Sequence, residues 1–335
     1  MDGIYILGND AVFDQTMALI NSIQAHNGDR YPICVVPYDD RMDRIREAIT
    51  EYSGVSVFDN AAILKRWTDF VYRFWDQVPQ RYDFWSKGGT TSGVHRLGAH
   101  NRFVAFDAES PFSRFVYLDA DTLALSSLEP FFEALDSVDF VTYDFQYKDP
   151  THVFNMELQK TTQFLTQTNS AEKLFCTGMF ASKNDVITPE GLEQVIESLQ
   201  GDNSQVLFPP APVNTSLNYT LITLGLSYSN FAIDWPKERR TGCCVTSDHF
   251  QERDWKLYDG DAPLIYFHYI GLSSKLFSRL CSGENIDFPY REIFLHYRYL
   301  KHPEERPVLK GKLINDDAPS VLGRLKRKIK GTLKV

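Results

Sequence analysis

The chain has 335 residues, of which 43% are hydrophobic and 24% are charged, so it can bury a large core as one large α/β domain or two fused ones. Its formal net charge of -9 excludes a general nucleic-acid-binding protein, because such a protein needs a basic face to neutralise phosphates. The five cysteines form neither a disulfide framework nor pairs at zinc-site spacing, and we find no leader or membrane-spanning run, so we expect a cytoplasmic protein.

Strands that alternate with helices open the chain. Continuous apolar runs predict buried strands at 4–7, 33–36 and 55–58, and helices are expected after the first two, around Met17 to Ile23 and at 42–52. This alternation indicates a mainly parallel sheet wound in a Rossmann-like way.

An aromatic-rich stretch follows at 67–75, with large side chains at helical spacing. Packing in the core is the favoured interpretation, and a platform that stacks sugars is the alternative. The glycine-rich segment 86–93 is expected to be a mobile loop, either a lid over a ligand or a linker. A helix over 94–106 then carries His95, Arg96 and Arg102.

A short apolar strand at 115–118, the fourth of the sheet, is followed by Asp119 and Asp121. Side chains two residues apart in an extended backbone point the same way, so these acids form a two-pronged carboxylate site. Open α/β sheets bind ligands at the carboxyl ends of parallel strands, which predicts a cation that carries an anionic substrate. Turn and helix-cap hydrogen bonds are the alternative role for both acids.

The order of elements is less regular after this motif. We expect a helix at 128–135, a strand at 140–143, a polar stretch at 146–171, a strand at 175–181 that returns to the sheet, a proline-containing loop at 206–213, a helix at 214–224 and a strand at 264–271. His268 lies near the end of the last strand.

The segment 324–335 carries two Arg and four Lys and no acidic residue. If it is helical, Leu322, just before it, and Leu325, Ile329 and Leu333 share one face, and the basic residues occupy the other. Such segments lie on anionic membranes, so we expect this tail to hold the protein on the inner face of the plasma membrane. A disordered solubilising tail is the alternative.

Three short sequences, LGNDA at 7–11, YLDAD at 117–121 and HYIG at 268–271, together resemble glycosyltransferase family 8, which includes glycogenin and bacterial lipopolysaccharide galactosyltransferases. The resemblance covers residues 4 to about 275 in order. It implies an α/β GT-A fold, with a Rossmann-like, mixed but mainly parallel sheet flanked by helices. A nucleotide-binding half at about 1–145, an acceptor half at about 146–300 and an extension at 301–335 are expected. The overall pattern is also similar to sugar transferases of cyanobacterial envelope polysaccharide clusters.

The resemblance further implies that Asp119, Asp121 and His268 bind Mn²⁺, or alternatively Mg²⁺. Two carboxylates and one imidazole leave the remaining positions of such a cation to the two phosphates of UDP. A core position is the alternative for His268, as a solitary histidine on an apolar strand.

Several further residues match positions at which the family binds its nucleotide sugar: Gly8, Asn9, Asp10, Asp39, Arg102, Ala120, Gly271 and Lys275. The resemblance places the uridine at Asn9 and Asp10, with Asp39 or Asp40 reaching the base. Arg102 would clamp a phosphate, and a surface salt bridge is its alternative role. Two departures stand out: Val12 where relatives often have Tyr, and Lys275 one residue later than the family's lysine.

The sugar pocket departs further, with Cys176-Thr177-Gly178 where relatives read Asn-x-Gly and Val213-Asn214 where they read Asp-Gln. Asn214 is expected to act in catalysis by orienting the sugar. A carboxamide is a poor nucleophile, which suits the front-face attack and retained anomeric configuration that the resemblance implies. A helix N-cap is the alternative for Asn214.

These patterns together favour a metal-dependent enzyme that transfers a hexose, glucose or galactose, from a UDP-sugar to a lipid-linked oligosaccharide or polysaccharide acceptor in envelope or exopolysaccharide synthesis. A catalytically silent nucleotide-sugar-binding scaffold is one alternative, supported by the exchanged residues at Cys176 and Val213. A haloacid-dehalogenase-like phosphatase is a weaker one, because that class has its D-x-D on the first strand and a threonine two residues past the second acid. Here Thr122 follows Asp121 directly.

Overall fold

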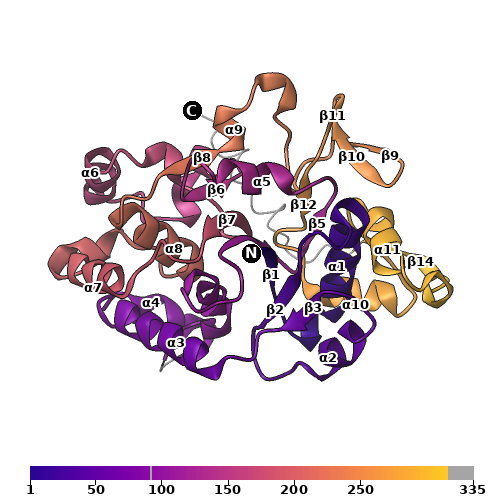
Figure 1. The fold of residues 1–335 in the computed structure, drawn as a ribbon, viewed down its shortest axis with the longest axis horizontal. Helices are drawn as coiled ribbons and strands as arrows, with labels where there is room; N and C mark the ends of the chain where they lie inside the picture. The colour runs from indigo at the N-terminus through magenta and orange to yellow at the C-terminus, as the bar shows by residue number, and fades with distance from the viewer. Residues whose placement is uncertain (91–92, 316–335) are drawn as a thin grey trace. The chain divides into compact units, whose positions relative to one another are not determined.

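The structure, a computed structural model, describes residues 1–90 and 93–315 (Figure 1). Contacts within the chain divide it into two compact units. Unit 1 comprises Met1–Asn9, Tyr31–Asp119 and Leu128–Arg240, and unit 2 comprises Asp10–Arg30, Ala120–Ser127 and the described residues from Thr241 onward. The division into a nucleotide half and an acceptor half stays a prediction.

Unit 1 is built on a seven-stranded sheet with the order β3-β2-β1-β4-β7-β6-β8. Its strands are β1 (Asp2–Gly8), β2 (Ile33–Pro37), β3 (Val55–Val57), β4 (Arg114–Asp119), β6 (Phe140–Thr142), β7 (Met179–Lys183) and β8 (Tyr228–Asn230). All neighbouring pairs are parallel except those of β7, which runs antiparallel to both β4 and β6. The predicted mixed, mainly parallel sheet is confirmed.

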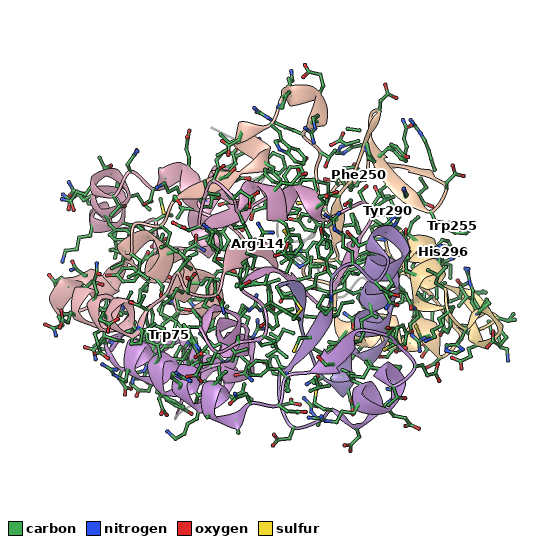
Figure 2. All side chains as sticks on the ribbon, viewed as in Figure 1. Trp75, Arg114, Phe250, Trp255, Tyr290 and His296 are labelled. Carbon is green, nitrogen blue, oxygen red and sulfur yellow. The ribbon has the colours of Figure 1, made fainter. Side chains whose placement is uncertain are left out.

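The two central strands bury both faces, which explains their continuous apolar sequences. Residues 115–118 of β4 and 4–6 of β1 are fully buried, and β1 pairs with β4 from Asp2 opposite Arg114 to Leu7 opposite Asp119. Arg114, labelled in Figure 2, ties the start of β4 to Asp2 of β1 through an ion pair of 2.6 Å. The carboxyl ends of β1 and β4 therefore meet at one edge of the sheet.

Helices surround this sheet within unit 1: α2 (Asp43–Ile49), α3 (Ala61–Asp76), α4 (Arg81–Trp85), α5 (Glu129–Ala134), α6 (Gln159–Gln167), α7 (Pro189–Ser198), α8 (Pro212–Thr223) and α9 (Phe231–Asp234). The aromatic stretch lies on α3, where Trp67, Phe74 and Trp75 are buried in the core of unit 1. Trp75 is labelled in Figure 2. Core packing of this stretch is confirmed, and the sugar-stacking platform is wrong.

Unit 2 holds α1 (Phe13–Asn27), α10 (Ser274–Cys281), α11 (Arg291–Arg298) and several short strand pairs. Its strands are β5 (Thr122–Ala124), β9 (Gln251–Arg253), β10 (Lys256–Asp259), β11 (Ala262–Pro263), β12 (Tyr266–His268), β13 (Glu284–Asp287) and β14 (Lys310–Asn315). Antiparallel pairing joins β12 to β5, and α1 packs beside α11, as Figure 1 shows. Leu123, Phe267 and Phe294 belong to the separate apolar core of this unit.

Four predicted elements differ from the structure. The helix expected at 94–106 is a 3₁₀ helix, η3 (Leu97–Phe106), preceded by Arg96 with a φ of 53°. The strand expected at 175–181 begins only at Met179, the helix expected from 214 begins at Pro212, and the strand expected at 264–271 is shortened to β12. That last strand pairs with β5 and not with the large sheet.

Two predictions fall wholly or partly outside the described residues. The basic tail at 324–335 lies outside them, and the segment 86–93 is described in part, with a 3₁₀ turn, η2 (Ser86–Gly88), at its start. The choice between lid and linker for 86–93 stays open. No helix in the part of the chain that the structure describes is long and apolar enough to cross a membrane.

Candidate functional site

Asp119 is the last residue of β4, and its carboxylate is held on one side by two neighbours. The phenol of Tyr117 donates a hydrogen bond to Oδ1 at 2.5 Å, and Nη2 of Arg102 lies 3.0 Å from the same oxygen. The second oxygen, Oδ2, accepts a long bond of 3.5 Å from Nη1 of Arg102. Tyr117 and Arg102 therefore fix the direction of the Asp119 carboxylate.

Arg102 is buried inside unit 1, at 5% exposure. Its guanidinium donates to the backbone carbonyls of Ala99, at 2.9 Å, and Thr177, at 2.6 Å, and lies 4.8 Å from the ring centroid of Tyr117. Burial alone would lower the pKa of Arg102, but the charges of Asp119 and Tyr117 outweigh burial and raise it above its ordinary value. The surface salt bridge considered for Arg102 is wrong, whereas its contact with a phosphate stays a prediction.

Asp121 and His268 lie together in unit 2. The pairing of β12 with β5 sets His268 opposite Thr122, so Nε2 of His268 comes within 3.2 Å of Oδ1 of Asp121. The backbone amide of Tyr269 donates to the carbonyl of Asp121 at 2.9 Å, which fixes the end of β12 to the acidic turn. His268 is 5% exposed, yet its ring faces a carboxylate and not only apolar neighbours.

Ala120 alone separates Asp119 from Asp121 along the chain, so the chain itself keeps these two acids close. Asp119, Asp121 and His268 each offer one ligand atom, and these three atoms lie within 4.8 Å of one another. Among the described residues they are the only group of three or more His, Cys, Asp or Glu side chains that could hold a metal ion. Carboxylate oxygens with one imidazole fit Mn²⁺ or Mg²⁺ better than a soft thiophilic metal.

Two of the predicted nucleotide-binding residues meet at the ends of β1 and β2. Asn9 is buried, and its side-chain amide donates to Oδ2 of Asp39 at 2.9 Å. Arg41 lies 2.5 Å from the same carboxylate, and its hydrogen bond, helped by that of Asn9, holds the pKa of Asp39 below its ordinary value. Gly8, which ends β1, pairs with Pro37 of β2 just before this cluster.

The remaining predicted nucleotide contacts belong to unit 2. Asp10 opens a 3₁₀ turn, η1 (Asp10–Val12), and Ala120 lies between the paired acids. Gly271, just after β12, has a φ of 81°, a left-handed conformation that favours glycine. Lys275 is exposed in the first turn of α10, where Ser273 caps its backbone amide at 3.4 Å.

The predicted sugar-pocket segment 175–178 is held by side chains from other elements. Asn214 accepts two hydrogen bonds from Thr177, at 3.2 Å from the amide and 2.6 Å from the hydroxyl. Because Ala211 is the N-cap of α8 and Asn214 lies within its first turn, the N-cap role considered for Asn214 is wrong. Asn218 accepts from the amide of Phe175 and donates to its carbonyl, and Asp144 accepts from the amide of Cys176.

Sequence reasoning missed Tyr117, Arg41, Asp144 and Asn218, which position the predicted residues. The contact of Tyr117 with Asp119 could have been predicted, because the two residues are two apart in a strand and their side chains share one face. Asp144 follows a predicted strand just as Asp119 does. Asn218 left no local signal, since its partner Phe175 is distant in sequence.

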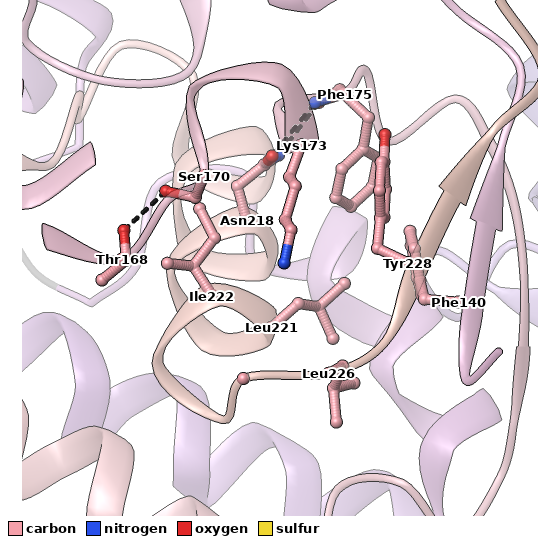
Figure 3. A pocket seen from close by; sticks show the side chains of 11 residues that line it. Phe140, Thr168, Ser170, Lys173, Phe175, Asn218, Leu221, Ile222, Leu226 and Tyr228 are labelled. Atoms are coloured by element: carbon pink, nitrogen blue, oxygen red, sulfur yellow. Dashed lines mark hydrogen bonds between the residues drawn. The ribbon is translucent and has the colours of Figure 1, made fainter. Parts of the chain in front are cut away.

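A cavity in unit 1 lies among Phe140, Phe175, Leu221 and Tyr228, beside Asn218 (Figure 3). None of the predicted nucleotide-binding, metal-binding or catalytic residues lines it. Its volume of about 40 Å³ would admit a few waters, since one water needs roughly 10–15 Å³. A nucleotide sugar is far larger than this cavity.

No protein-family model matches the chain, and no curated protein matches it. Among solved structures, the chain is similar to the bifunctional glycosyltransferase WbbM, with a TM-score of 0.53 and 12% identity over 91% of this chain and 51% of that one. The chain thus spans about half the length of WbbM. At this identity the likeness shows the fold alone, and that fold is the GT-A fold expected from the sequence.

Two further glycosyltransferases are similar at lower TM-scores. One is galactosyltransferase LgtC in complex with donor and acceptor sugar analogues, with a TM-score of 0.46 and 12% identity over 83% of this chain and 94% of that one. The other is the apo form of GlyE from Streptococcus pneumoniae TIGR4, with a TM-score of 0.46 and 14% identity over 97% of this chain and 63% of that one.

Proposed function

We propose that the protein is a metal-dependent glycosyltransferase that transfers a hexose, glucose or galactose, from a UDP-sugar to a lipid-linked oligosaccharide or polysaccharide acceptor. The observation that carries this proposal is the trio of Asp119, Asp121 and His268 beside the carboxyl end of β4 in a GT-A fold. Envelope or exopolysaccharide synthesis is the setting in which such acceptors occur.

Asp119, Asp121 and His268 are the residues that would hold Mn²⁺ or Mg²⁺. When bound, such a cation neutralises charge on the departing UDP. Tyr117 and Arg102 fix the direction of the Asp119 carboxylate, which would offer one oxygen to the cation. With one ligand atom each from Asp119, Asp121 and His268, the cation would keep further positions for the phosphate oxygens of UDP.

The protein's own charges prepare this position for a diphosphate. Arg102 retains its positive charge at any working pH, because burial lowers its pKa by less than the charges around it, chiefly those of Asp119 and Tyr117, raise it. It offsets part of the negative charge that Asp119 contributes, and it fixes the direction of that carboxylate. Lys275, exposed at the start of α10, is the second cation that we assign to the diphosphate.

We assign the uridine to the cluster at the ends of β1 and β2. Asp39 stays ionised well into the acidic range, because Arg41 lowers its pKa, and it can accept from an N–H of the base. The side chain of Asn9 donates a hydrogen bond to Asp39, which fixes the Asp39 carboxylate in position to accept from the base. Asp10, Gly8, Ala120 and Gly271 complete the proposed nucleotide contacts.

Asn214 is the group that we assign to the transferred sugar. Its carbonyl oxygen accepts from both the amide and the hydroxyl of Thr177, which fixes the orientation of the carboxamide. The amide nitrogen then faces away from Thr177 and can donate to a sugar hydroxyl. Since a carboxamide is a poor nucleophile, this arrangement suits attack by the acceptor hydroxyl on the face that UDP leaves, with retention.

The basic segment 324–335 supports a peripheral position on the inner face of the plasma membrane, where lipid-linked acceptors are accessible. The support is compositional, from two Arg and four Lys without an acidic residue. In the alternative, the protein is a silent scaffold that binds the same metal and nucleotide sugar but does not transfer the sugar. Turnover of a UDP-sugar is therefore what separates the enzyme from the scaffold.

The test is calorimetric titration of UDP with and without Mn²⁺ on the wild type, on Asp121→Asn and on Asp185→Asn. Asp185→Asn is the matched control, because Asp185 is exposed and the substitution removes the same charge away from Asp119, Asp121 and His268. We expect tight binding that needs both Mn²⁺ and Asp121, with Asp185→Asn behaving as wild type. Equal affinity of wild type and Asp121→Asn in Mn²⁺ would refute the site.

A panel of UDP-sugars then tests the reaction. Wild type should hydrolyse UDP-glucose or UDP-galactose slowly without an acceptor and faster with one, and Asp121→Asn should do neither. Nucleotide binding without turnover of any UDP-sugar would favour the catalytically silent scaffold over the enzyme.

A further inference from the structure

Two adjacent cysteines lie next to the backbone that positions His268. Cys243 and Cys244 are both thiols, and their sulfur atoms are 3.6 Å apart. Cys243 is 4% exposed, whereas Cys244 is half-buried. A disulfide has sulfurs about 2.0 Å apart, so the two sulfur atoms must approach each other by about 1.6 Å for the bond to form.

The same segment holds the backbone of His268 on both sides. The amide of His268 donates to the carbonyl of Cys243 at 2.7 Å, and the amide of Val245 donates to the carbonyl of His268 at 2.9 Å. Cys244 and His268 form a parallel bridge. Cys243 and Cys244 therefore sit inside the hydrogen-bond pattern that orients one of the three metal-binding candidates.

We propose that Cys243 and Cys244 form a reversible disulfide that weakens metal binding by displacing His268. The oxidant class is a low-molecular-weight disulfide such as glutathione disulfide. The disulfide itself is independent of the proposed function, whereas its effect on metal binding rests on it.

The exchange is balanced without any further reactant. The thiolate of Cys244 bonds to one sulfur of glutathione disulfide, and the bond between the two glutathione sulfurs breaks to release one thiol. The sulfur of Cys243 then bonds to Sγ of Cys244 and displaces the second glutathione. The two cysteine protons end on the two released thiols, so the protein pair is oxidised by two electrons and glutathione disulfide is reduced by two.

The ring that forms contains the peptide bond between the two cysteines. Neighbouring Cα atoms across a trans peptide are about 3.8 Å apart, whereas disulfides join Cα atoms usually about 4.4–6.8 Å apart. Because this separation is shorter than the usual range, ring closure strains the peptide between Cys243 and Cys244, and we expect its plane to reorient. The carbonyl that turns is that of Cys243, which accepts from the amide of His268.

A strained ring of this kind is easily reduced, which suits a control element and not a structural link. In a reducing compartment a protein disulfide is transient and redox-sensing. The remaining cysteines include two that are poor candidates for such exchange, because burial raises the pKa of both Cys34 and Cys281 to about 12. Cys34 and Cys281 are therefore weak competitors of the adjacent pair for the oxidant.

The test treats the full-length reduced protein with glutathione disulfide and then measures two quantities. Mass spectrometry of the peptide that holds Cys243 and Cys244 reports the loss of two hydrogen atoms, and titration with Mn²⁺ alone reports metal affinity. We expect the link to form and Mn²⁺ affinity to fall about tenfold, the lower end of the effect of disturbing a metal ligand's support. Reduction with dithiothreitol should restore the affinity.

Cys244→Ser should abolish both the link and the response to oxidant, and Cys281→Ala should keep both as in the wild type. Absence of the link overturns the proposal, and a link without a change in Mn²⁺ affinity overturns the coupling to His268. If reduced wild type binds no Mn²⁺ at all, the metal site of the proposed function fails and the coupling with it. The mass measurement then still decides whether the disulfide forms.

Discussion

The side chain of Asp119 illustrates how one residue is prepared for a charged ligand before any ligand arrives. Tyr117 and Arg102 take one of its oxygens, and the backbone carbonyl of Thr177 fixes the guanidinium in turn. Arg102 is buried and has three groups to bond at once, so its planar fork matters as much as its charge. A compact ammonium at the same place could not reach all three.

Arg102→Lys should therefore weaken the binding of Mn²⁺ measured without nucleotide, by about 10-fold to 100-fold, as the loss of a ligand's supporting partner does. The substitution keeps the positive charge beside Asp119, so a change in affinity reports lost orientation and not lost charge. Electron paramagnetic resonance of free Mn²⁺ measures it.

Arg46→Lys is the matched control for this measurement, because Arg46 is exposed and pairs with Asp59 at 2.6 Å. It should leave Mn²⁺ affinity unchanged. If Arg102→Lys left Mn²⁺ affinity intact and weakened only UDP binding, Arg102 would act on phosphate alone.

The sequence predicted that Asp119, Asp121 and His268 lie together, but not which residues hold them in position. Asp119 and Asp121 follow an apolar strand, and such a strand end is visible from the order of residues alone. The burial of Arg102 and the bond between Asn9 and Asp39 arise from chain segments that meet only after folding. The predicted roles of Gly8, Lys275 and Asn214 toward a nucleotide sugar stay predictions.

Among the elements, the segment 175–178 shows how side chains can end a strand. Its amides donate to Asn218, Asp144 and Asn214, so they are not available for a sheet ladder. The strand begins only at Met179, where the pairing with β4 starts. Asn218 matters most, because it is fully buried and bonds both the amide and the carbonyl of Phe175.

Asn218→Leu should lower the free energy of unfolding by about 3 kcal/mol, because it leaves two buried backbone groups of Phe175 without partners, at roughly 1–3 kcal/mol each. Urea denaturation followed by circular dichroism measures the difference.

Asn203→Leu is the control, since Asn203 is exposed and donates only to the carbonyl of Ser198. A change there should stay within about 0.5 kcal/mol. Equal effects of the two substitutions would mean that Asn218 does not hold the segment.

Pattern-based prediction succeeded for elements whose signal is local. The strands at 4–7, 33–36 and 115–118 are continuous apolar runs, and the structure has β1, β2 and β4 there. The strand expected at 175–181 contains an equally apolar start, Phe175, but distant side chains take its backbone bonds. The short strands β9 to β11 and β13 have too few residues to show a period.

On the scale of the whole molecule, each unit contains a histidine that folding keeps neutral. His100 of unit 1 is 2% exposed, and burial followed by the charge of Arg102 lowers its pKa to about 3. Its Nε2 accepts from the indole of Trp75 at 3.3 Å, an arrangement that a protonated ring would break. In unit 2, burial and the charge of Lys256 lower the pKa of His26 to about 4.

Stability should consequently fall on acidification. Below about pH 6.5 unfolded His100 takes up a proton, while the folded residue does not until about pH 3. The unfolded state binds more protons in this window, so each pH unit costs about 1.4 kcal/mol per such histidine. From pH 6.5 to pH 5, His100 alone should cost roughly 2 kcal/mol.

Urea denaturation at pH 7.5 and pH 5 measures this slope. His100→Gln should reduce the loss between the two conditions, whereas His249→Gln, at an exposed position, should not. The same loss in wild type and His100→Gln would show that other groups set the acid sensitivity.

The two units alternate along the chain, with changes after Asn9, Arg30, Asp119, Ser127 and Arg240. Unit 2 therefore draws α1 and β5 from the first half of the sequence, and α11 and β12 from the second. A chimaera that exchanges everything after Arg240 would place a foreign helix against α1 and a foreign strand against β5. We therefore expect recombination between relatives to preserve these contacts best where all three stretches of unit 2 are inherited together.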